Sequence, residues 1–577
     1  MLTSFGDSSS DLQPTQDGSP AYACNCSMCA GSGGNNLQNP SVQPDVPATG
    51  AGGVAALLAG SQWAGQDVSG KTVVTYSFSN ASSQFSDESN RFSATLTPFS
   101  EADKAMTWAT LESISAVCNL RFVEVPDQAD GSGQLRYAYS KAPNEMGFSG
   151  FAFFPSNSAA AGDVWIGADQ ASSKWDFFRP NLVLHETLHA LGLKHPFEGP
   201  VTLDTQSNIL ANTVMSYSAV AGITNLGLFQ YPTEPMPLDV AALQALYGAA
   251  AHNEGDTVYR LDEAQFQGGF RALWDSSGRD TLDAGAVSQG VALDLGAGER
   301  SDIGASVGTY SAQGVGSVTY TWTLAIALGC KIENAIGSRF DDVILGNELD
   351  NLLIGGEGND MIHGGGGSNI AQGGEGDDRF VVAGSFDQIN GGPGMDTVTF
   401  LGSREDFVFT EGLGQMSVAR AADRSVVASL VDVERVEFSD AVLAVLQPNL
   451  PLSQLQGHGG EALRLYKAAL DRLPDIEGLS YHTKALDNGA SLADVAQQFM
   501  SSPEFQARYG QPTNSQFVEL LYANVLDRSA DTAGLSFHLA RLGSGASRAD
   551  ILVGFSESPE NQASVVGLGQ IPVLYEL

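Results

Sequence analysis

The chain is poor in basic residues, in cysteine and in long apolar runs. Of its 577 residues only 28 are Lys or Arg, against 66 Asp or Glu, which gives a formal net charge of −38 at pH 7. So large an acidic excess repels nucleic-acid phosphates and anionic lipid headgroups, and we therefore expect neither as a partner. The most apolar stretches, such as residues 51–60, are far shorter than the ~20 residues that cross a bilayer, so no membrane span is expected.

Five cysteines in a chain of this length do not make a disulfide framework. Two of them lie far apart in apolar surroundings and are predicted to be inert buried thiols, namely Cys118 and Cys330. The other three fall within six residues of a leader rich in Ser, Gly, Asn and Pro, residues 1–50, which is expected to be disordered. These three are Cys24, Cys26 and Cys29. The N-terminus also lacks a basic segment followed by an apolar run, so we expect either a cytoplasmic protein or export by a route that does not read this end.

After the leader, the pattern of apolar, glycine and charged residues changes along the chain and predicts three folded regions. Residues 51–250 mix strand patterns, at 72–79, 120–125 and 162–167, with helical ones at 102–119, 181–193 and 237–249. Residues 251–447 consist of short apolar segments between Gly and Asp turns and read as all-β. Residues 455–577 are helical and repeat at a spacing of 56, as in Leu465-Tyr466 and Leu521-Tyr522. The expected fold is multidomain: α/β, then β, then all-α.

The segment HETLHALGLKH, which begins at His185, has the spacing of a catalytic zinc site. His185 and His189 stand four apart on a predicted helix, so both imidazoles project from one face. Gly192 allows the left-handed backbone that ends the helix, and His195 can then return as third ligand. Three histidines leave a fourth position open for water, and Glu186 is placed to take a proton from that water as general base.

A downstream NTVMSY segment, residues 212–217, completes the pattern of the metzincin proteases. With GSQW at 60–63, GDVWIG at 162–167, HP after the third histidine and PLDVAALQALYG from 237, the region resembles the serralysin family of secreted metzincin zinc endopeptidases. The resemblance implies that Met215 forms a hydrophobic floor beneath the metal, and that Tyr217 ligates it at rest or donates a hydrogen bond to the oxyanion. It also implies that the GDVWIG strand is an edge strand that pairs with an extended protein or peptide substrate.

Glycine and aspartate recur with a period of nine between residues 337 and 398. An apolar residue keeps the same phase through seven copies, from Ile344 to Val398, which a flexible linker has no reason to do. The pattern resembles the calcium-binding β-roll of RTX proteins. Several calcium ions are expected, at sites made from three full GGxGxD turns and one partial turn; the predicted ligands are Gly355, Glu357, Asp360, Gly373, Glu375, Asp378, Gly391, Asp396 and Asp342.

Two copies of the repeat carry Asn351 and Asn369 where the others carry a carboxylate, which leaves those turns in doubt as strong sites. A fragment at 275–280 looks like a degenerate first turn. Because clustered carboxylates repel one another without the ion, the roll is expected to stay open at low calcium and to fold at millimolar calcium. The resemblance implies a type I secretion route and an extracellular location, either free or associated with the cell surface.

The N-terminal leader and the C-terminal helical tail carry less specific sequence signals than the two metal-binding regions. The leader resembles a pro-segment, and one of its cysteine thiolates could fill the fourth zinc position and keep a zymogen latent; the alternative is a disordered tag whose cysteines are incidental. The helical tail resembles a paired domain of unknown function and could bind a surface-layer or cell-surface partner. The function expected is a zinc metalloendopeptidase, and the alternative is a cell-surface or adhesive RTX calcium-binding protein with a vestigial protease domain.

Overall fold

The computed structural model describes residues 42–44, 52–128, 132–223, 226–311, 318–383, 386–412, 415–446, 457–562 and 573–576. The three leader cysteines, Cys24, Cys26 and Cys29, lie outside these ranges. By contacts the chain divides into two compact units: residues 1–252, 268–276 and 306–328 form the first, and residues 253–267, 277–305 and 329–577 the second. Within the described ranges, no helix combines the length and apolarity that a membrane span requires.

The first unit is built on a five-stranded sheet with the strand order β4-β3-β5-β7-β6. Strands β4 (Leu120–Glu124), β3 (Thr72–Phe78), β5 (Leu135–Ser140) and β7 (Asp163–Gly167) are parallel to their neighbours, and β6 (Gly150–Ala152) runs antiparallel to β7. Every residue of β5 and β7 is buried, as expected for central strands covered on both faces.

The sheet order corrects one expectation. The GDVWIG segment forms β7, which lies between β5 and β6 and is therefore not an edge strand. The edge strand next to β7 is β6, whose three residues carry almost no strand signal of their own. Edge position depends on which strands pair across the sheet, and the sequence of a single strand does not record that.

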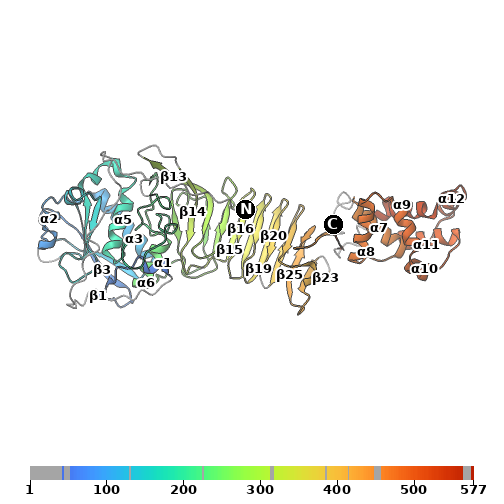
Figure 1. Cartoon of the computed structure of the whole chain (residues 1–577), viewed down its shortest axis with the longest axis horizontal. Coiled ribbons are helices and arrows are strands. Elements are labelled where there is room, and N and C mark those ends of the chain that lie inside the picture. The colour runs from blue at the N-terminus through green and yellow to red at the C-terminus, as the bar shows by residue number, and fades with distance from the viewer. Residues whose placement is uncertain are drawn as a thin grey trace. The chain divides into compact units, whose positions relative to one another are not determined.

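Three longer helices belong to this unit (Figure 1): α3 (Glu101–Val117), α5 (Arg179–Ala190) and α6 (Pro237–Tyr247). A capping box between Ser100 and Asp103 begins α3, and α5 packs against β6 and β7. The shorter elements are α1 (Gly52–Ala55), α2 (Asn90–Ser93), α4 (Ala142–Glu145), η1 (Asp87–Ser89), η2 (Ala168–Ala171), η3 (Ser173–Trp175), β1 (Val42–Pro44), β2 (Ser61–Trp63), β8 (Leu226–Leu228), β10 (Arg271–Leu273) and β14 (Thr319–Ile326).

The repeat region in the second unit forms two sheets of short strands, which run parallel through the repeats and end in antiparallel strands. Neighbouring strands of the repeat pair with an 18-residue offset, such as Ile344 with Ile362 and Leu353 with Ala371. Successive nonapeptides therefore alternate between the two sheets, and Figure 1 shows the resulting ladder of strands. The predicted apolar positions are all buried, from Ile344 to Val398, so the β-roll expected from the phase of the repeat is confirmed.

The strand bounds follow the nine-residue period closely in the centre of the roll. They are β9 (Val258–Arg260), β11 (Thr281–Asp283), β12 (Ala292–Asp294), β13 (Arg300–Ser311), β15 (Asn334–Ile336), β16 (Val343–Leu345), β17 (Leu352–Glu357), β18 (Met361–His363), β19 (Ser368–Glu375), β20 (Arg379–Val382), β21 (Phe386–Asn390), β22 (Thr397–Phe400), β23 (Phe407–Gly412), β24 (Gln415–Arg420), β25 (Val426–Val431), β26 (Arg435–Glu437), β27 (Val442–Leu446) and β28 (Val573–Glu576), with the short helix η4 (Arg404–Asp406) before β23. One sheet of the roll contains the strand order β12-β16-β18-β20-β22-β26-β27-β28, and the other has the order β9-β11-β15-β17-β19-β21-β25-β24-β23.

The C-terminal helices repeat at the predicted spacing. Helices α7 (His458–Leu470), α8 (Ile476–Asp487) and α9 (Leu492–Ser501) recur 56 residues later as α11 (Asn514–Leu526), α12 (Thr532–Gly543) and α13 (Arg548–Ser556); α10 (Pro503–Tyr509) follows α9. The His482 ring stacks on Phe499, and the His538 ring packs on Phe555 in the same way. These two histidines therefore act in packing, as their recurrence in register suggests. The four boundaries expected from the sequence stay a prediction, because division by contacts yields two units.

Candidate metal centre

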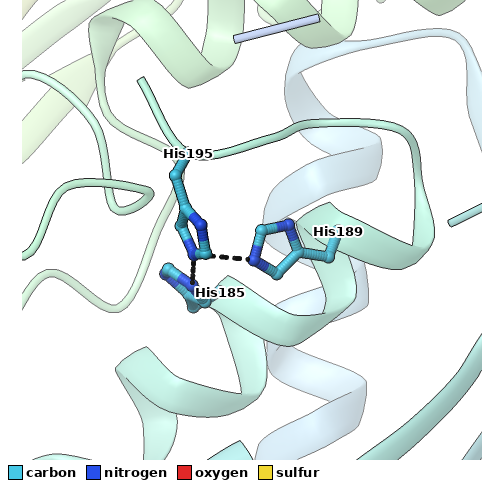
Figure 2. Close-up of side chains that lie close together, drawn as sticks. All are labelled: His185, His189 and His195. Atoms are coloured by element: carbon cyan, nitrogen blue, oxygen red, sulfur yellow. Dashed lines mark hydrogen bonds between the residues drawn. The ribbon is translucent and has the colours of Figure 1, made fainter. Parts of the chain in front are cut away.

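Three histidine side chains converge in the first unit, and helix α5 with the turn after it explains why. His185 and His189 lie one turn apart on α5. The chain then turns at Gly192, which has φ +104°, and returns to place His195 opposite the helix. Figure 2 shows the three rings facing a common point. The Nε2 atom of His195 lies 3.2 Å from that of His185 and 3.0 Å from that of His189.

This spacing fits zinc. Two nitrogens that bind one tetrahedral Zn²⁺ at 2.0–2.1 Å lie about 3.3 Å apart. The candidate ligand atoms of the three residues all lie within 4.8 Å of one another, and the three residues are buried. The set therefore has the donor type, the separation and the open fourth position of a catalytic zinc site.

The other ring nitrogen of each histidine has its own acceptor. Nδ1 of His185 donates to the Val214 carbonyl at 2.8 Å, and Nδ1 of His189 to the Leu193 carbonyl at 2.8 Å. Nδ1 of His195 donates to Oε1 of Glu198 at 2.9 Å. Each of these bonds holds the proton on Nδ1 and leaves the Nε2 lone pair for a metal.

Burial keeps these imidazoles neutral. It lowers the pKa of His185 to about 4 and that of His195 to about 2, and it lowers the pKa of His189 well below its usual value. Neutral imidazole is the form that binds a metal, so the ligands are preorganised. The sequence interpretation did not single out Glu198, although its place three residues after His195 was a usable signal.

Glu186 lies on the same helix between the first two ligands, and its side chain is fully buried. Its carboxylate lies against the backbone of Gly150 on the edge strand β6, where an ideal Cβ would be 2.5 Å from Oε1. The absence of a side chain at Gly150 therefore leaves the space that the carboxylate occupies. Gly150 was also missed at the sequence level, since a lone glycine in a loop-like stretch carries no distinguishing signal.

Tyr217 reaches the centre from the segment after α5. Its Oη lies 2.6 Å from Nε2 of His195, on the side of the ring that faces the other histidines. The centroid of its ring is 4.7 Å from that of His195 and 6.0 Å from that of His185. The hydroxyl is therefore within reach of whatever the three nitrogens bind.

Met215 is fully buried, and the turn that carries it is held by Asp239 of α6. The Asp239 carboxylate accepts the Thr213 hydroxyl at 2.5 Å, the Val214 N–H at 2.8 Å and the Met236 N–H at 3.0 Å. Because the Val214 carbonyl in turn accepts His185 Nδ1, the chain of contacts runs from Asp239 to a metal ligand. Asp239 is the third functional candidate that the sequence interpretation did not name.

The predicted calcium residues lie in the turns of the roll. Glu357 ends β17 and Glu375 ends β19, and the two are paired in register. The four predicted aspartates, Asp342, Asp360, Asp378 and Asp396, stack 18 residues apart, with the N–H of each donating to the carboxylate of the next. Gly355, Gly373 and Gly391 begin the three full turns and lie close to the carboxylates of their own turns. The structure thus brings these residues together in one row.

Comparison with known families agrees with two of these regions. Residues 336–371 and 372–401 match the RTX calcium-binding nonapeptide repeat (4 copies). Residues 462–504 and 496–565 match a domain of unknown function, DUF4214.

Several curated proteins are similar to part of this chain. Serralysin G of Dickeya chrysanthemi is 34% identical over 371 residues, which is 60% of this chain and 74% of that protein. Metallopeptidase AprA of Pseudomonas marginalis is 29% identical over 352 residues, 56% of this chain and 69% of its own length. Serralysin B of Dickeya chrysanthemi is 30% identical over 309 residues, 49% of this chain and 60% of that protein. With its zinc-type histidine centre and its calcium-binding RTX repeats, the chain belongs to the serralysin family.

Proposed function

We propose that the protein is a secreted metzincin zinc endopeptidase that cleaves extended protein segments. The observation that carries the proposal is the convergence of three Nε2 atoms and the Tyr217 hydroxyl on one centre, with Glu186 next to the first ligand on helix α5. The alternative of an adhesive RTX protein with a vestigial protease is not favoured, since neither the ligand set nor Glu186 has been lost.

A bound zinc ion would supply Lewis acidity, polarising the scissile carbonyl and making water nucleophilic near neutral pH. Glu186 takes the proton that the attacking water loses and delivers it to the leaving amine as the C–N bond breaks. The Tyr217 hydroxyl donates a hydrogen bond to the carbonyl oxygen as negative charge develops there. Water and peptide are thus converted to a carboxylic acid and an amine, with the proton balance carried by Glu186.

The edge strand β6 offers a way to hold the substrate. Its outer side has no neighbouring strand among the described residues, and its first residue, Gly150, lies beside Glu186. An extended peptide that pairs with β6 would therefore run past the general base with its backbone hydrogen-bonded. This arrangement favours loops or unfolded segments, because a substrate must present a free strand.

The direct test compares the zinc-loaded full chain with Glu186→Ala on casein. We expect Glu186→Ala to retain one zinc per chain and to lose activity by a factor of at least about 10². Glu145→Ala, which removes an exposed carboxylate from α4, is the matched control and should cleave normally. Cleavage by Glu186→Ala at the natural rate would refute the assignment of Glu186.

The roll suggests how the protein leaves the cell. We propose a type I route in which the chain stays open at cytosolic calcium and folds outside, where calcium neutralises the stacked carboxylates. Circular dichroism of the full chain should show a gain of β-structure on adding calcium, and an unchanged spectrum would contradict this. Latency through Cys24, Cys26 or Cys29 and a cell-surface partner for the helical tail remain proposals without support from the described residues.

A further inference from the structure

The two edges of the roll differ in a way that the single repeat does not show. Because strands pair at an offset of 18 residues, alternate nonapeptides place their sixth residue on opposite edges. One edge carries only aspartates, at 342, 360, 378 and 396. We call it the acidic edge. The other carries Asn351 and Asn369, followed by Asp387, and we call it the amide edge.

On the acidic edge, three carboxylates are arranged alike. Asp360, Asp378 and Asp396 are 1%, 0% and 0% exposed. Oδ1 of each accepts the backbone N–H of the residue 18 positions earlier, at 2.8–2.9 Å. Oδ2 of each is buried and has no hydrogen-bond partner within the described part of the chain. A buried carboxylate oxygen without a hydrogen-bond donor raises the free energy of the folded state, and a bound cation at these three atoms would remove that penalty.

Each of these oxygens shares a small space with a backbone carbonyl. If Gly355 carried a side chain, its Cβ would contact Oδ2 of Asp360 and lie 2.6 Å from the Gly373 carbonyl oxygen, so both oxygens border the space beside Gly355. A Cβ at Gly373 would meet Oδ2 of Asp378 and lie 2.6 Å from the Gly391 carbonyl oxygen.

The third space repeats the arrangement. At Gly391 the two neighbours are Oδ2 of Asp396 and the Asp432 carbonyl oxygen. Carboxylate and carbonyl oxygens are the ligands that calcium takes.

Asp342 differs from its three counterparts although it lies on the same edge. Its Oδ2 accepts the Ser338 N–H at 2.5 Å, and its Oδ1 accepts the Ser338 hydroxyl at 2.9 Å and the Val291 N–H at 2.7 Å. A serine stands here where the full turns have their second glycine. Both oxygens are therefore already satisfied by the protein.

At Asn369, the amide edge places a hydrogen-bond donor where the acidic edge has a bare oxygen. Asn369 Nδ2 donates to the Gly366 carbonyl at 3.0 Å and to Oδ1 of Asp387 at 2.8 Å. A Cβ at Gly364 would lie 2.6 Å from this same Nδ2, at the place that a carboxylate oxygen takes on the acidic edge. An amide NH₂ has no lone pair to offer a cation, and it uses up the oxygens that could have bound one.

Asn351 also has its hydrogen bonds made within the roll, but it turns Oδ1 toward the corresponding space, where a Cβ at Gly346 would lie 2.5 Å from that oxygen. Its Nδ2 donates to the Glu333 carbonyl at 2.9 Å and to Oδ1 of Asn347 at 3.1 Å, while its Oδ1 accepts the Asn347 N–H at 2.9 Å. The amide therefore joins neighbouring turns by hydrogen bonds, which is the task that calcium performs on the acidic edge.

We propose that the roll binds calcium along the acidic edge, at three positions formed around Asp360, Asp378 and Asp396, and that Asn351 and Asn369 close their own turns of the opposite edge without a metal. This inference rests on the calcium-bound roll proposed above. It assigns the two asparagines of the repeat a physical role: calcium ions link neighbouring turns on the acidic edge, and amide hydrogen bonds link the turns of Asn351 and Asn369.

The test counts calcium ions per full chain after equilibrium dialysis against calcium alone, with zinc measured in the same sample. Asp378→Asn should lose at least one ion relative to the natural chain. Asn369→Asp should gain one, because it replaces the blocking NH₂ by an oxygen. The gain cannot come from misfolding, so it remains decisive even if Asp378→Asn disturbs the roll.

Two results would overturn the proposal: an unchanged calcium count in Asp378→Asn, or no additional ion in Asn369→Asp. A natural chain that binds no calcium would overturn it together with the calcium-bound roll. The zinc content and casein cleavage measured in parallel report on the protease separately, so a failure of the edge assignment is distinguishable from a failure of the proposed function.

Discussion

The Glu186 side chain leaves no room for a side chain at Gly150. A methyl carbon added at Gly150 would lie 2.5 Å from Oε1, 2.8 Å from Cγ and 2.9 Å from Cδ of Glu186. One residue belongs to the edge strand β6 and the other to α5. The strand edge at which a substrate would pair is therefore in contact with the carboxylate that would take the proton from the attacking water. The first prediction follows from this relationship.

Gly150→Ala should reduce kcat for casein-type substrates by about tenfold or more, because the new methyl group displaces the Glu186 carboxylate while leaving the histidines in place. Steady-state kinetics with zinc analysis of the same sample checks it. Gly255→Ala is the matched control, since nothing lies within 4 Å of a Cβ at that glycine. Full activity in Gly150→Ala would show that the carboxylate position is not critical.

Tyr217→Phe should lower kcat/KM by about 10–10²-fold with zinc content unchanged. The reason is the loss of one hydrogen-bond donor to the developing oxyanion, a contact that exists only in the transition state. Tyr481→Phe removes the hydroxyl of an exposed tyrosine of α8 and should be silent. A loss of zinc in Tyr217→Phe would instead assign the tyrosine a role in holding the metal.

Asp239→Ala should weaken zinc retention and destabilise the first unit by about 3 kcal/mol, because it leaves the buried Thr213, Val214 and Met236 donors without an acceptor. Zinc loss is measured by competition with a chelator, and stability by urea unfolding. The control is Glu112→Ala, an exposed acid on α3. Destabilisation without faster zinc loss would mean that Asp239 supports the turn but does not position His185.

Asp163 should make the stability of the first unit depend on pH. It is 1% exposed, Ser89 donates to its Oδ2 at 2.5 Å, and burial raises its pKa to about 7. Its unfolded pKa is about 3.9, so the folded state holds the proton more tightly. The stability that this group contributes is complete below pH ~4 and is lost as the pH rises through 7.

Relative to Asp163→Asn, which does not titrate, the natural chain should lose about 2 kcal/mol of unfolding free energy between pH 5.5 and pH 8.5. Urea unfolding at fixed calcium, followed by tryptophan fluorescence, measures this difference. Because both chains contain the same carboxylates in the roll, the effect of their titration cancels in the difference between the two unfolding free energies. A difference that does not change with pH would mean that Asp163 is ionised throughout this range.

Local spacing explains why much of the metal centre was predictable. Two ligands four apart on a helix share a face whatever surrounds them, and Gly192 with positive φ is a local requirement of the turn that follows. Tyr217 followed from the family resemblance. Glu198, Asp239 and Gly150 were not identified, because each acts through a contact made only after folding.

The β-roll, too, was predictable in part from local sequence. A period of nine with one apolar residue in constant phase predicted the buried positions, since each nonapeptide repeats the same backbone path. The sequence therefore determined the helix that carries two ligands, the roll and the 56-residue helical repeat, all of which rest on short-range periodicity. The tertiary structure alone decided that β6 and not β7 is the edge strand beside α5, and that Asp239 holds the turn of Met215 by hydrogen bonds. It also decided that Asn351 and Asn369 fall on the edge of the roll opposite to Asp360 and Asp378. Those outcomes depend on which distant segments pair, and strand pairing and burial are properties of the assembled chain.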